Sequence, residues 1–480
     1  MYTKITIFIS IALSCFMPLS ATVINVPGDQ PTIQDGIDAA IDGDTVLVAP
    51  DTYHENIHFR EKGIVVASQY ILDDNPAYVE STIINGSTPS HSDTGSCVLI
   101  VSDSAYTMAD TAAALVGFTL TGGFGTKWQD EHGAGLFREG GGILIQYLSP
   151  RIRHNKIVEN HITDTQGVTS TGGGAIRCGD GNPSIQNNVI VSNSALYGGG
   201  IVLNYTGADI KNNIIAYNSA GGAYGGGGGL WILSNSTFSK NIENNTIVFN
   251  HPGGTAPGGG LRLWSANVTI RNNIIWGNEA VQIYRQGGVV VVNYCDVQGS
   301  YPGEGNIDTD PFFEIQNFYL SDSSPCIDAG DTSILYNDPE DPFNPGYALW
   351  PSKGFLRNDM GTYGGPHRTL LPDVPIGIAE RPHEKMPKGI TLQNHPNPFS
   401  HKTNIAFTVP EEVTHLLLSI YDATGQLVVR FSRITPTHMQ PTIVSWNGRD
   451  SRGKLVSSGV YFCHLEASNY AQSKRMVVLR

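Results

Sequence analysis

A repeated unit of 25 to 33 residues dominates the middle of this 480-residue chain. Between residues 140 and 278, each of five units contains an asparagine, an isoleucine two places later and a second asparagine five places after the first. The first asparagines of the units are Asn155, Asn188, Asn213, Asn245 and Asn273, at intervals of 33, 25, 32 and 28 residues. A period in this range indicates a solenoid or another array of stacked units.

The local composition of each unit predicts strands and turns. Each unit opens with small residues followed by isoleucine or leucine, as in Gly141-Gly142-Ile143, and its short Ile/Val segments are broken by Gly, Asn and Ser. A capped amphipathic helix is missing from every unit, which excludes leucine-rich, ankyrin and tetratricopeptide repeats. Stacked coils of three short strands and three turns need about this many residues. The sequence therefore predicts an all-β fold, a right-handed parallel β-helix solenoid.

The first asparagines are predicted to form a structural ladder. At the same turn of every coil, a side-chain amide can hydrogen-bond the backbone of the next coil. The alternative is that each asparagine only favours its own turn. The ladder is preferred for Asn155, Asn188, Asn213, Asn245 and Asn273 because all five second asparagines keep the same offset.

Charge and cysteine content limit the possible partners. The net charge of −14 argues against a nucleic-acid or anionic membrane surface, and also against a strongly basic cleft for polyuronates. Cysteines are scattered without a Cys-x-x-Cys motif, so neither a zinc site nor a disulfide framework is indicated. No metal site and no cofactor are expected. An oxidising compartment would still permit a disulfide between Cys295 and Cys326. The protein is expected to be a monomer.

Residues 1–21 have the pattern of an export signal. Lys4 precedes an apolar segment from Ile5 to Phe16, and Leu19-Ser20-Ala21 offers a small-residue cleavage site. A lipoprotein signal at Cys15 is the weaker alternative. After cleavage, no stretch suits a transmembrane span.

The first mature residues contain a short amphipathic helix. Ile33, Ile37, Ala40 and Ile41 share one face, and Thr32 with Asp35 is a suitable N-terminal cap. Such a helix is expected to close the open end of the coil stack. Together with Gly43-Asp44-Thr45-Val46 and Tyr53-His54-Glu55-Asn56, this element, in residues 22–60, resembles the N-terminal part of pectin-lyase-like β-helix proteins. The resemblance covers residues 22–365 and implies the fold, without implying a chemistry.

The end of the chain departs from the repeat. Residues 293–365, rich in Asp, Pro and Gly, form a predicted closing segment over the last coil, and a proline-rich linker follows at 366–395. From residue 396 to 480 the apolar residues alternate as in a small Ig-like β-sandwich. Segments such as Asn397-Pro398-Phe399 and Ser458-Gly459-Val460-Tyr461 are similar to the sorting domain of type IX secretion cargo and to the Ig-like domain of flagellar hook-assembly proteins. The resemblance implies export to the cell surface or the medium, with the secretion machinery as a partner; a generic Ig-like accessory module is the alternative.

Two groups of residues are candidates for a functional site. Asp130, Glu131 and His132 lie in a polar loop at 125–140 and could perform acid–base chemistry if they line one groove, the alternative being a charged surface loop. Alignment of the repeats places Leu144, Arg177, Val202, Trp231 and Arg262 in one outward column. Trp231, Arg177 and Arg262 are therefore candidates for contacting a sugar ring.

The sequence does not identify an active site. The Asn-Thr-Asp and Gly-His-Gly motifs of polygalacturonases are absent, so no family catalytic residue can be transferred. The leading hypothesis is an exported, surface-displayed or secreted protein that binds or processes extracellular polysaccharide. The alternatives are a non-catalytic structural or adhesion protein with the β-helix as a rigid spacer, and a polysaccharide lyase or glycoside hydrolase with an unfamiliar site.

Overall fold

The computed structural model describes residues 21–102, 112–130, 132–222, 225–233, 240–254, 256–314, 317–374, 391–397, 399–408, 416–422, 427–431, 442–450, 453–467 and 470–479. Residues 1–20 of the predicted signal segment 1–21 and the candidate residue Glu131 lie outside these residues. The chain forms two compact units, residues 1–375 and 376–480. No helix among the described residues is both long and apolar enough to cross a membrane.

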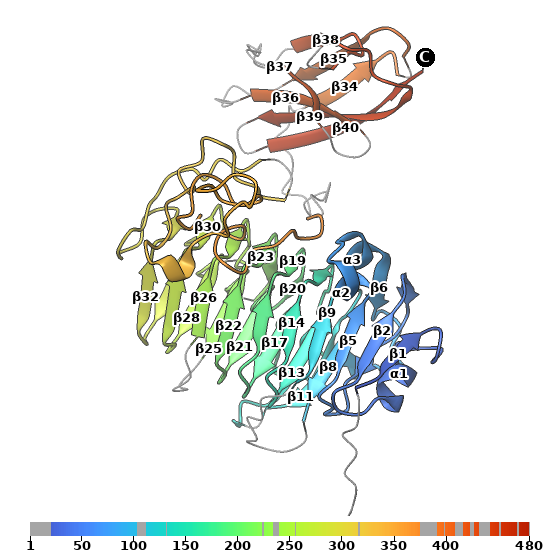
Figure 1. The fold of residues 1–480 in the computed structure, drawn as a ribbon, viewed down its shortest axis with the longest axis vertical. Coiled ribbons are helices and arrows are strands. Elements are labelled where there is room, and N and C mark those ends of the chain that lie inside the picture. Colours follow the sequence, from blue (N-terminus) through green and yellow to red (C-terminus); the bar gives the residue numbers. More distant parts are fainter. Residues whose placement is uncertain are drawn as a thin grey trace, which may run out of the picture. The chain divides into compact units, whose positions relative to one another are not determined.

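The first unit is an all-β trunk built from three stacks of parallel strands (Figure 1). Stack A contains β1 (Val23–Val26), β2 (Thr45–Val48), β5 (Val65–Ser68), β9 (Ala114–Val116), β14 (Arg151–Arg153), β18 (Ser184–Gln186), β22 (Ala208–Lys211), β26 (Lys240–Glu243), β29 (Val268–Arg271) and β32 (Val290–Asn293). Stack B contains β3 (Asp51–Tyr53), β6 (Thr82–Asn85), β10 (Thr119–Thr121), β15 (Lys156–Val158), β19 (Val189–Val191), β23 (Ile214–Ala216), β27 (Thr246–Val248), β30 (Ile274–Trp276) and β33 (Asp296–Val297). Stack C contains β4 (Ile57–His58), β8 (Val98–Val101), β13 (Ile143–Gln146), β17 (Ile176–Gly179), β21 (Ile201–Asn204), β25 (Leu230–Leu233), β28 (Leu261–Trp264) and β31 (Ile283–Gln286).

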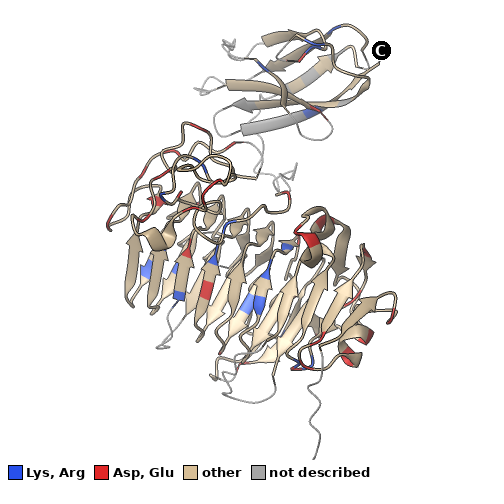
Figure 2. Cartoon of the chain, viewed as in Figure 1, with Lys and Arg blue, Asp and Glu red and all other residues tan. Residues whose placement is uncertain are grey.

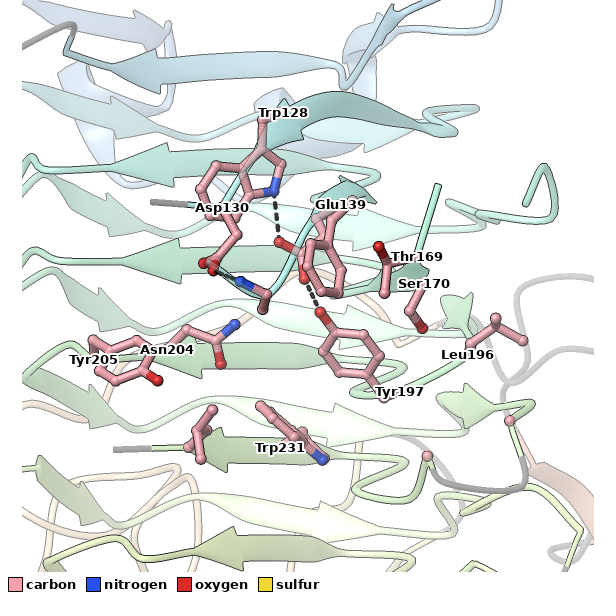
Figure 3. A pocket seen from close by; sticks show the side chains of 15 residues that line it. Trp128, Asp130, Glu139, Thr169, Ser170, Leu196, Tyr197, Asn204, Tyr205 and Trp231 are labelled. Atoms are coloured by element: carbon pink, nitrogen blue, oxygen red, sulfur yellow. Dashed lines mark hydrogen bonds between the residues drawn. The ribbon is translucent and has the colours of Figure 1, made fainter. Parts of the chain in front are cut away.

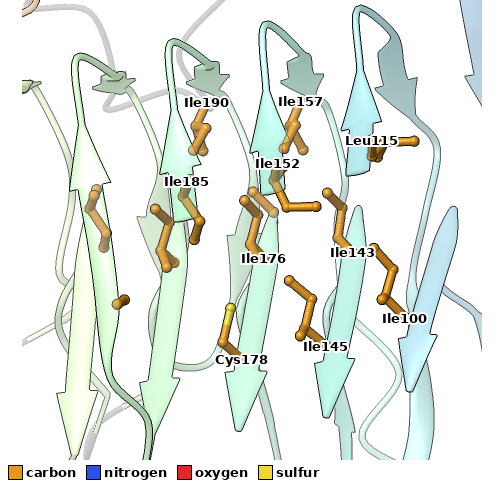
Figure 4. Close-up of a cluster of buried hydrophobic side chains, with 14 of the residues drawn as sticks. Ile100, Leu115, Ile143, Ile145, Ile152, Ile157, Ile176, Cys178, Ile185 and Ile190 are labelled. Carbon is orange, nitrogen blue, oxygen red and sulfur yellow. The ribbon is translucent and has the colours of Figure 1, made fainter. Parts of the chain in front are cut away.

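The core of the trunk is a set of columns of like residues between the three stacks (Figure 4). Ile152 pairs with Ile185 in stack A, Ile157 with Ile190 in stack B, and Ile143 with Ile176 in stack C. All six side chains are fully buried. Because a parallel ladder sets equivalent positions of successive coils side by side, the repeat in the sequence becomes continuous apolar packing along the axis.

The asparagines of the repeats are buried at the turns and are joined across coils. The Asn213 backbone N–H donates to Asn245 Oδ1 at 2.9 Å, and Asn213 Nδ2 donates to the same oxygen at 3.0 Å. The same pair of bonds joins the other neighbours in the series of Asn155, Asn188, Asn213, Asn245 and Asn273. The second asparagines form an equivalent column, Asn160, Asn193, Asn218, Asn250 and Asn278. Each amide thereby satisfies backbone groups that the turns leave unpaired.

Helix α1 (Ile33–Ala39) begins at the predicted cap, with Thr32 Oγ1 accepting from Asp35 N at 3.0 Å. Ile33, Ile37 and Ala40 are buried and join the apolar core of the first coils. Ile41, predicted on the same face, is 45% exposed because the helix has already ended at Ala39. Two further short helices, α2 (Tyr70–Asp73) and α3 (Ala77–Ser81), lie between β5 and β6.

The closing segment, predicted to cover the last coil, forms a strap that runs along several coils of the trunk. Residues 317–374 run back along the outer face of stack B: Asp331 is bonded to Asn272, Asp359 to Asn244, Thr362 to Asn212, and His367 to Asn187. Phe318, Met360, Tyr363, Leu371 and Val374 of this strap pack on Val191, Ile214 and Ile274. The strap packs on stack B because the outer face of that stack is apolar. The strap includes a short 3₁₀ turn at Ile334–Tyr336.

Cysteine side chains in the described residues are free and buried. Cys326 Sγ donates to Asp296 Oδ2 at 3.2 Å, and Asn273 N donates to Cys295 Sγ at 3.4 Å, so each thiol is hydrogen-bonded to a different residue. Their positions leave the possible Cys295–Cys326 bridge unformed in this structure.

The second unit is a small antiparallel β domain. One sheet contains β34 (Thr391–His395), β35 (Thr403–Thr408) and β38 (Thr442–Trp446), and the other contains β37 (Leu427–Phe431), β36 (Leu416–Asp422), β39 (Gly459–Ala467) and β40 (Tyr470–Val478). Ile405, Leu418, Trp446 and Met476 belong to their shared apolar core. The structure differs from the predicted linker at both ends: Leu371 and Val374 pack on the trunk, and residues 391–395 already form β34.

Candidate functional site

A second layer of strands covers part of stack C. Strands β7 (Thr94–Gly95), β11 (Gly125–Gln129), β12 (Leu136–Glu139) and β16 (Ser170–Gly172) form a four-stranded sheet in the order β16-β12-β11-β7. The segment predicted as a polar loop is therefore an antiparallel hairpin, in which Trp128 pairs with Phe137 and Thr126 with Glu139. It starts and ends at glycines with positive φ, Gly125 at 81° and Gly140 at 64°, which let the chain leave and rejoin the trunk.

A cavity of about 400 Å³ opens between this hairpin and stack C (Figure 3). Aromatic rings make up much of its wall, and the remaining described lining comes from small, apolar and polar residues. The aromatic residues are Trp128, Phe137, Tyr197, Tyr205 and Trp231. Asp130, Glu139, Asn204, Thr169 and Ser170 supply the polar groups. Both the volume and the mixture of rings with a few polar groups are typical of a site for a small organic ligand or part of a polymer.

Glu139 is the buried carboxylate at the back of this cavity. Its Oε2 accepts a hydrogen bond from Trp128 Nε1 at 2.7 Å, and its Oε1 accepts one from the Tyr197 hydroxyl. Arg177 Nε lies 3.0 Å from Oε2. Burial raises the pKa of Glu139, while Arg177 and the hydrogen bonds from Tyr197 and Trp128 oppose that shift. Burial and the neighbouring Glu139 charge also raise the pKa of Tyr197 well above its usual value, so that hydroxyl remains a donor.

Arg177 stands behind the aromatic wall. Its guanidinium carbon is 3.8 Å from the Trp128 ring centre, and the same group donates to Gln146 Oε1. Its side chain is buried and is not part of the cavity wall. The predicted outward column exists in this register, but the covering hairpin removes Arg177 from contact with a ligand and assigns it to supporting Trp128 and Glu139.

Asp130 and His132 lie near the hairpin turn. Asp130 lines the cavity, and its Oδ2 accepts from Ala134 N at 2.8 Å, which shapes the turn. His132 stacks on Tyr205 with 3.8 Å between ring centres, and its Nε2 is 3.0 Å from Asp180 Oδ1. These contacts bring Asp130 and His132 to the same side of the site. Glu139 was not among the candidate residues, since nothing in the local sequence distinguishes it from a surface glutamate on a strand.

Trp231 and Arg262 occupy neighbouring positions on stack C. Trp231 lines the cavity, 4.9 Å from Tyr197 between ring centres. Arg262 is directly paired with Trp231 in the ladder, is buried, and donates to the backbone oxygen of Gly225. Trp231 therefore lines the cavity, whereas Arg262 is bonded to the protein backbone, and contact of either side chain with a sugar ring stays a prediction.

The described residues contain no group of three or more His, Cys, Asp or Glu side chains arranged to hold a metal ion. The charged groups of the trunk strands are mixed in sign and spread over several coils (Figure 2). Among the described cavity-lining residues there is neither lysine nor arginine.

Comparison with known proteins identifies one part of the chain. Residues 396–470 match the family model of the FlgD Ig-like domain. This match agrees with the antiparallel sandwich of the second unit. No curated protein matches the chain.

One solved structure matches a short part of the chain. It is PorZ, described as an essential bacterial surface component of the type-IX secretion system of Porphyromonas gingivalis. The identity is 25%, and the match covers 18% of this chain and 11% of PorZ, with a TM-score of 0.15. At that TM-score the match does not establish a common architecture.

Proposed function

We propose that this protein is an exported β-helix protein whose trunk binds extracellular glycan in the cavity beside stack C. The observation that carries the proposal is the group of five aromatic residues around a cavity of about 400 Å³. The apolar faces of sugar rings pack well on aromatic side chains, and Asn204, Thr169 and Ser170 supply groups that can hydrogen-bond hydroxyls.

Binding without cleavage is the form of this function that the side chains favour. A glycoside hydrolase needs one carboxylic acid and one carboxylate that are free to act on the glycosidic bond. Glu139 is instead fully buried and engaged by Trp128, Tyr197 and Arg177. Among the described lining residues Asp130 is the remaining carboxylate and does not make such a pair by itself, so we assign Asp130 and Glu139 to shaping the site.

The test is a glycan-array binding screen on the mature full-length chain, with release of oligosaccharide measured in the same wells. We expect binding without release, and loss of binding in Trp231→Ala. Trp350→Ala is the matched control, because Trp350 lies on the strap and is 55% exposed. Release of oligosaccharide would establish an enzyme. Absence of any binding would favour the rigid-spacer function.

We also propose that the second unit directs the chain to the type IX secretion machinery. The match of residues 396–470 to the FlgD Ig-like domain and the signal-like pattern of residues 1–21 support this role. Deletion of residues 391–480 in a host with that machinery should retain the protein inside the cell envelope. Unchanged appearance at the cell surface or in the medium would refute it.

A further inference from the structure

Beyond Trp231, the same face of stack C continues over two more strands, β28 and β31. In the ladder, Leu233 pairs with Trp264, Trp231 with Arg262, and Arg262 with Tyr284. Trp264 is 39% exposed and Tyr284 is half-buried. Aromatic surface thus extends from the cavity along the direction in which the coils stack.

Arg262 holds the two outer rings in place. Its guanidinium carbon is 5.6 Å from the Trp264 ring centre and 5.9 Å from the Tyr284 ring centre, while the same group donates to Gly225 O. The arginine therefore lies close to both rings and is itself fixed by the Gly225 backbone. We name Trp264, Arg262 and Tyr284 the outer platform.

The distance along this face suits a chain of sugars. Adjacent parallel strands are about 4.8 Å apart, so the path from β21, with Asn204, to β31, with Tyr284, spans about 14 Å. That length exceeds one sugar ring.

The charges of the site point to the type of sugar. Asp130 lines the cavity with no described lysine or arginine beside it, and the nearby arginines are engaged by Glu139 and by Gly225 O. A polyuronate would bring carboxylates against Asp130 without a cation to offset them, and like charges in contact disfavour binding. A neutral chain meets no such penalty.

We infer that this face binds a neutral glycan chain of several sugar units, held by the cavity at one end and by the outer platform at the other. The inference rests on the proposed glycan-binding function and adds the length and charge of the ligand. Trp264 is the residue that separates a chain-binding face from a site for a single sugar.

The experiment measures affinity by isothermal titration on the mature full-length chain. The probes are neutral xylo-, cello-, manno- and laminari-oligosaccharides, each from disaccharide to hexasaccharide, with oligogalacturonates of the same lengths. We expect a neutral series in which affinity rises with length. In Trp264→Ala, the ratio of hexasaccharide affinity to disaccharide affinity should fall by about fivefold to tenfold, and the disaccharide affinity itself should not change. Trp264→Phe should retain most of the rise, and Trp350→Ala all of it.

The outcomes separate the two proposals. Length dependence that survives in a folded Trp264→Ala variant, or tighter binding of oligogalacturonates, would overturn the inference and leave the glycan-binding function standing. Binding of poly-L-proline that depends on Trp264 would assign the face to a peptide and overturn it as well. If no oligosaccharide in the panel binds, the proposed function fails, and the inference with it.

Discussion

Arg177 Nε lies 3.0 Å from Glu139 Oε2, and each of the two side chains is 1% exposed. The arginine comes from β17 of the trunk and the glutamate from β12 of the covering hairpin. This ion pair is therefore a buried polar link between the two layers that enclose the cavity. Without it, Trp128 would lose both the cation against its ring and the carboxylate that accepts from its N–H.

The first prediction concerns this ion pair. Arg177→Met should lower the free energy of unfolding of the trunk by about 3–5 kcal/mol, because it leaves Glu139 charged and buried. Urea unfolding followed by tryptophan fluorescence measures the change. Arg60→Met is the matched control: Arg60 forms a solvent-exposed pair with Asp38 at 3.3 Å, which should contribute about 1 kcal/mol or less. An equal effect of both substitutions would show that the buried pair does not link the layers.

The asparagine ladder gives a second prediction. Asn213 Nδ2 donates to Ile185 O, Lys211 O and Asn245 Oδ1, and its Oδ1 accepts from Asn188 N. Asn213→Leu should cost about 3 kcal/mol or more, since each buried group left unpaired costs about 1–3 kcal/mol. Asn241→Leu, on the partly exposed outer face of stack A, should cost less than about 1 kcal/mol. An unchanged melting temperature of Asn213→Leu would remove the ladder argument.

The third prediction concerns how the strap is attached. Asn244 has φ 51°, and its Nδ2 donates to Asn358 Oδ1, Asp359 O and Gly361 O. Asn244→Gly keeps the left-handed backbone accessible while removing these bonds. Hydrogen exchange at the Gly361 and Thr362 amides should become faster, with a stability loss of about 1–2 kcal/mol. Ser192→Gly, at φ 55° on another turn, controls for glycine entropy and should leave those amides protected. Equal exchange in both variants would show that Asn244 does not hold the strap.

The fourth prediction is a dependence of stability on pH. Burial raises the pKa of Asp296 to about 6, against about 3.9 for an unfolded aspartate. The folded state then binds the proton more tightly, so this contribution is present below pH 4 and is lost as the pH rises through about 6. Burial also raises the pKa values of Asp338 and Asp359 in the strap, which adds to the same trend.

Asp296→Asn should therefore reduce the loss of stability between pH 4 and pH 7 by about 2 kcal/mol. Urea unfolding at the two pH values provides the measurement. Asp322→Asn should not reduce this loss of stability, because the hydrogen bond and charge of Lys353 lower the pKa of the Asp322 carboxyl. Asp322 therefore adds stability as the pH rises, which is the opposite of the Asp296 effect. A pH dependence in Asp296→Asn equal to that of the wild type would refute the assignment.

The sequence by itself determined the stacking of the trunk. The Asn and Ile positions recur at one offset in every unit, and in a parallel solenoid such positions must meet across the ladder. The alignment of Leu144, Arg177, Val202, Trp231 and Arg262 followed from the same regularity, and the paired strands have that register. The N-terminal helix could be predicted because its cap and apolar face are local signals.

Only the tertiary structure decided what covers those columns. The hairpin containing Glu139 folds over stack C, and the strap folds back over stack B to reach Asn187 from His367, 180 residues away in the chain. Neither segment shares the period of the repeat, so no spacing in the sequence relates Glu139 to Arg177 or His367 to Asn187. Repetition specifies contacts between like positions, whereas the single-copy segments find their places through burial and hydrogen bonding in three dimensions. The hairpin among them turns the outward Arg177 into a buried support and creates the cavity.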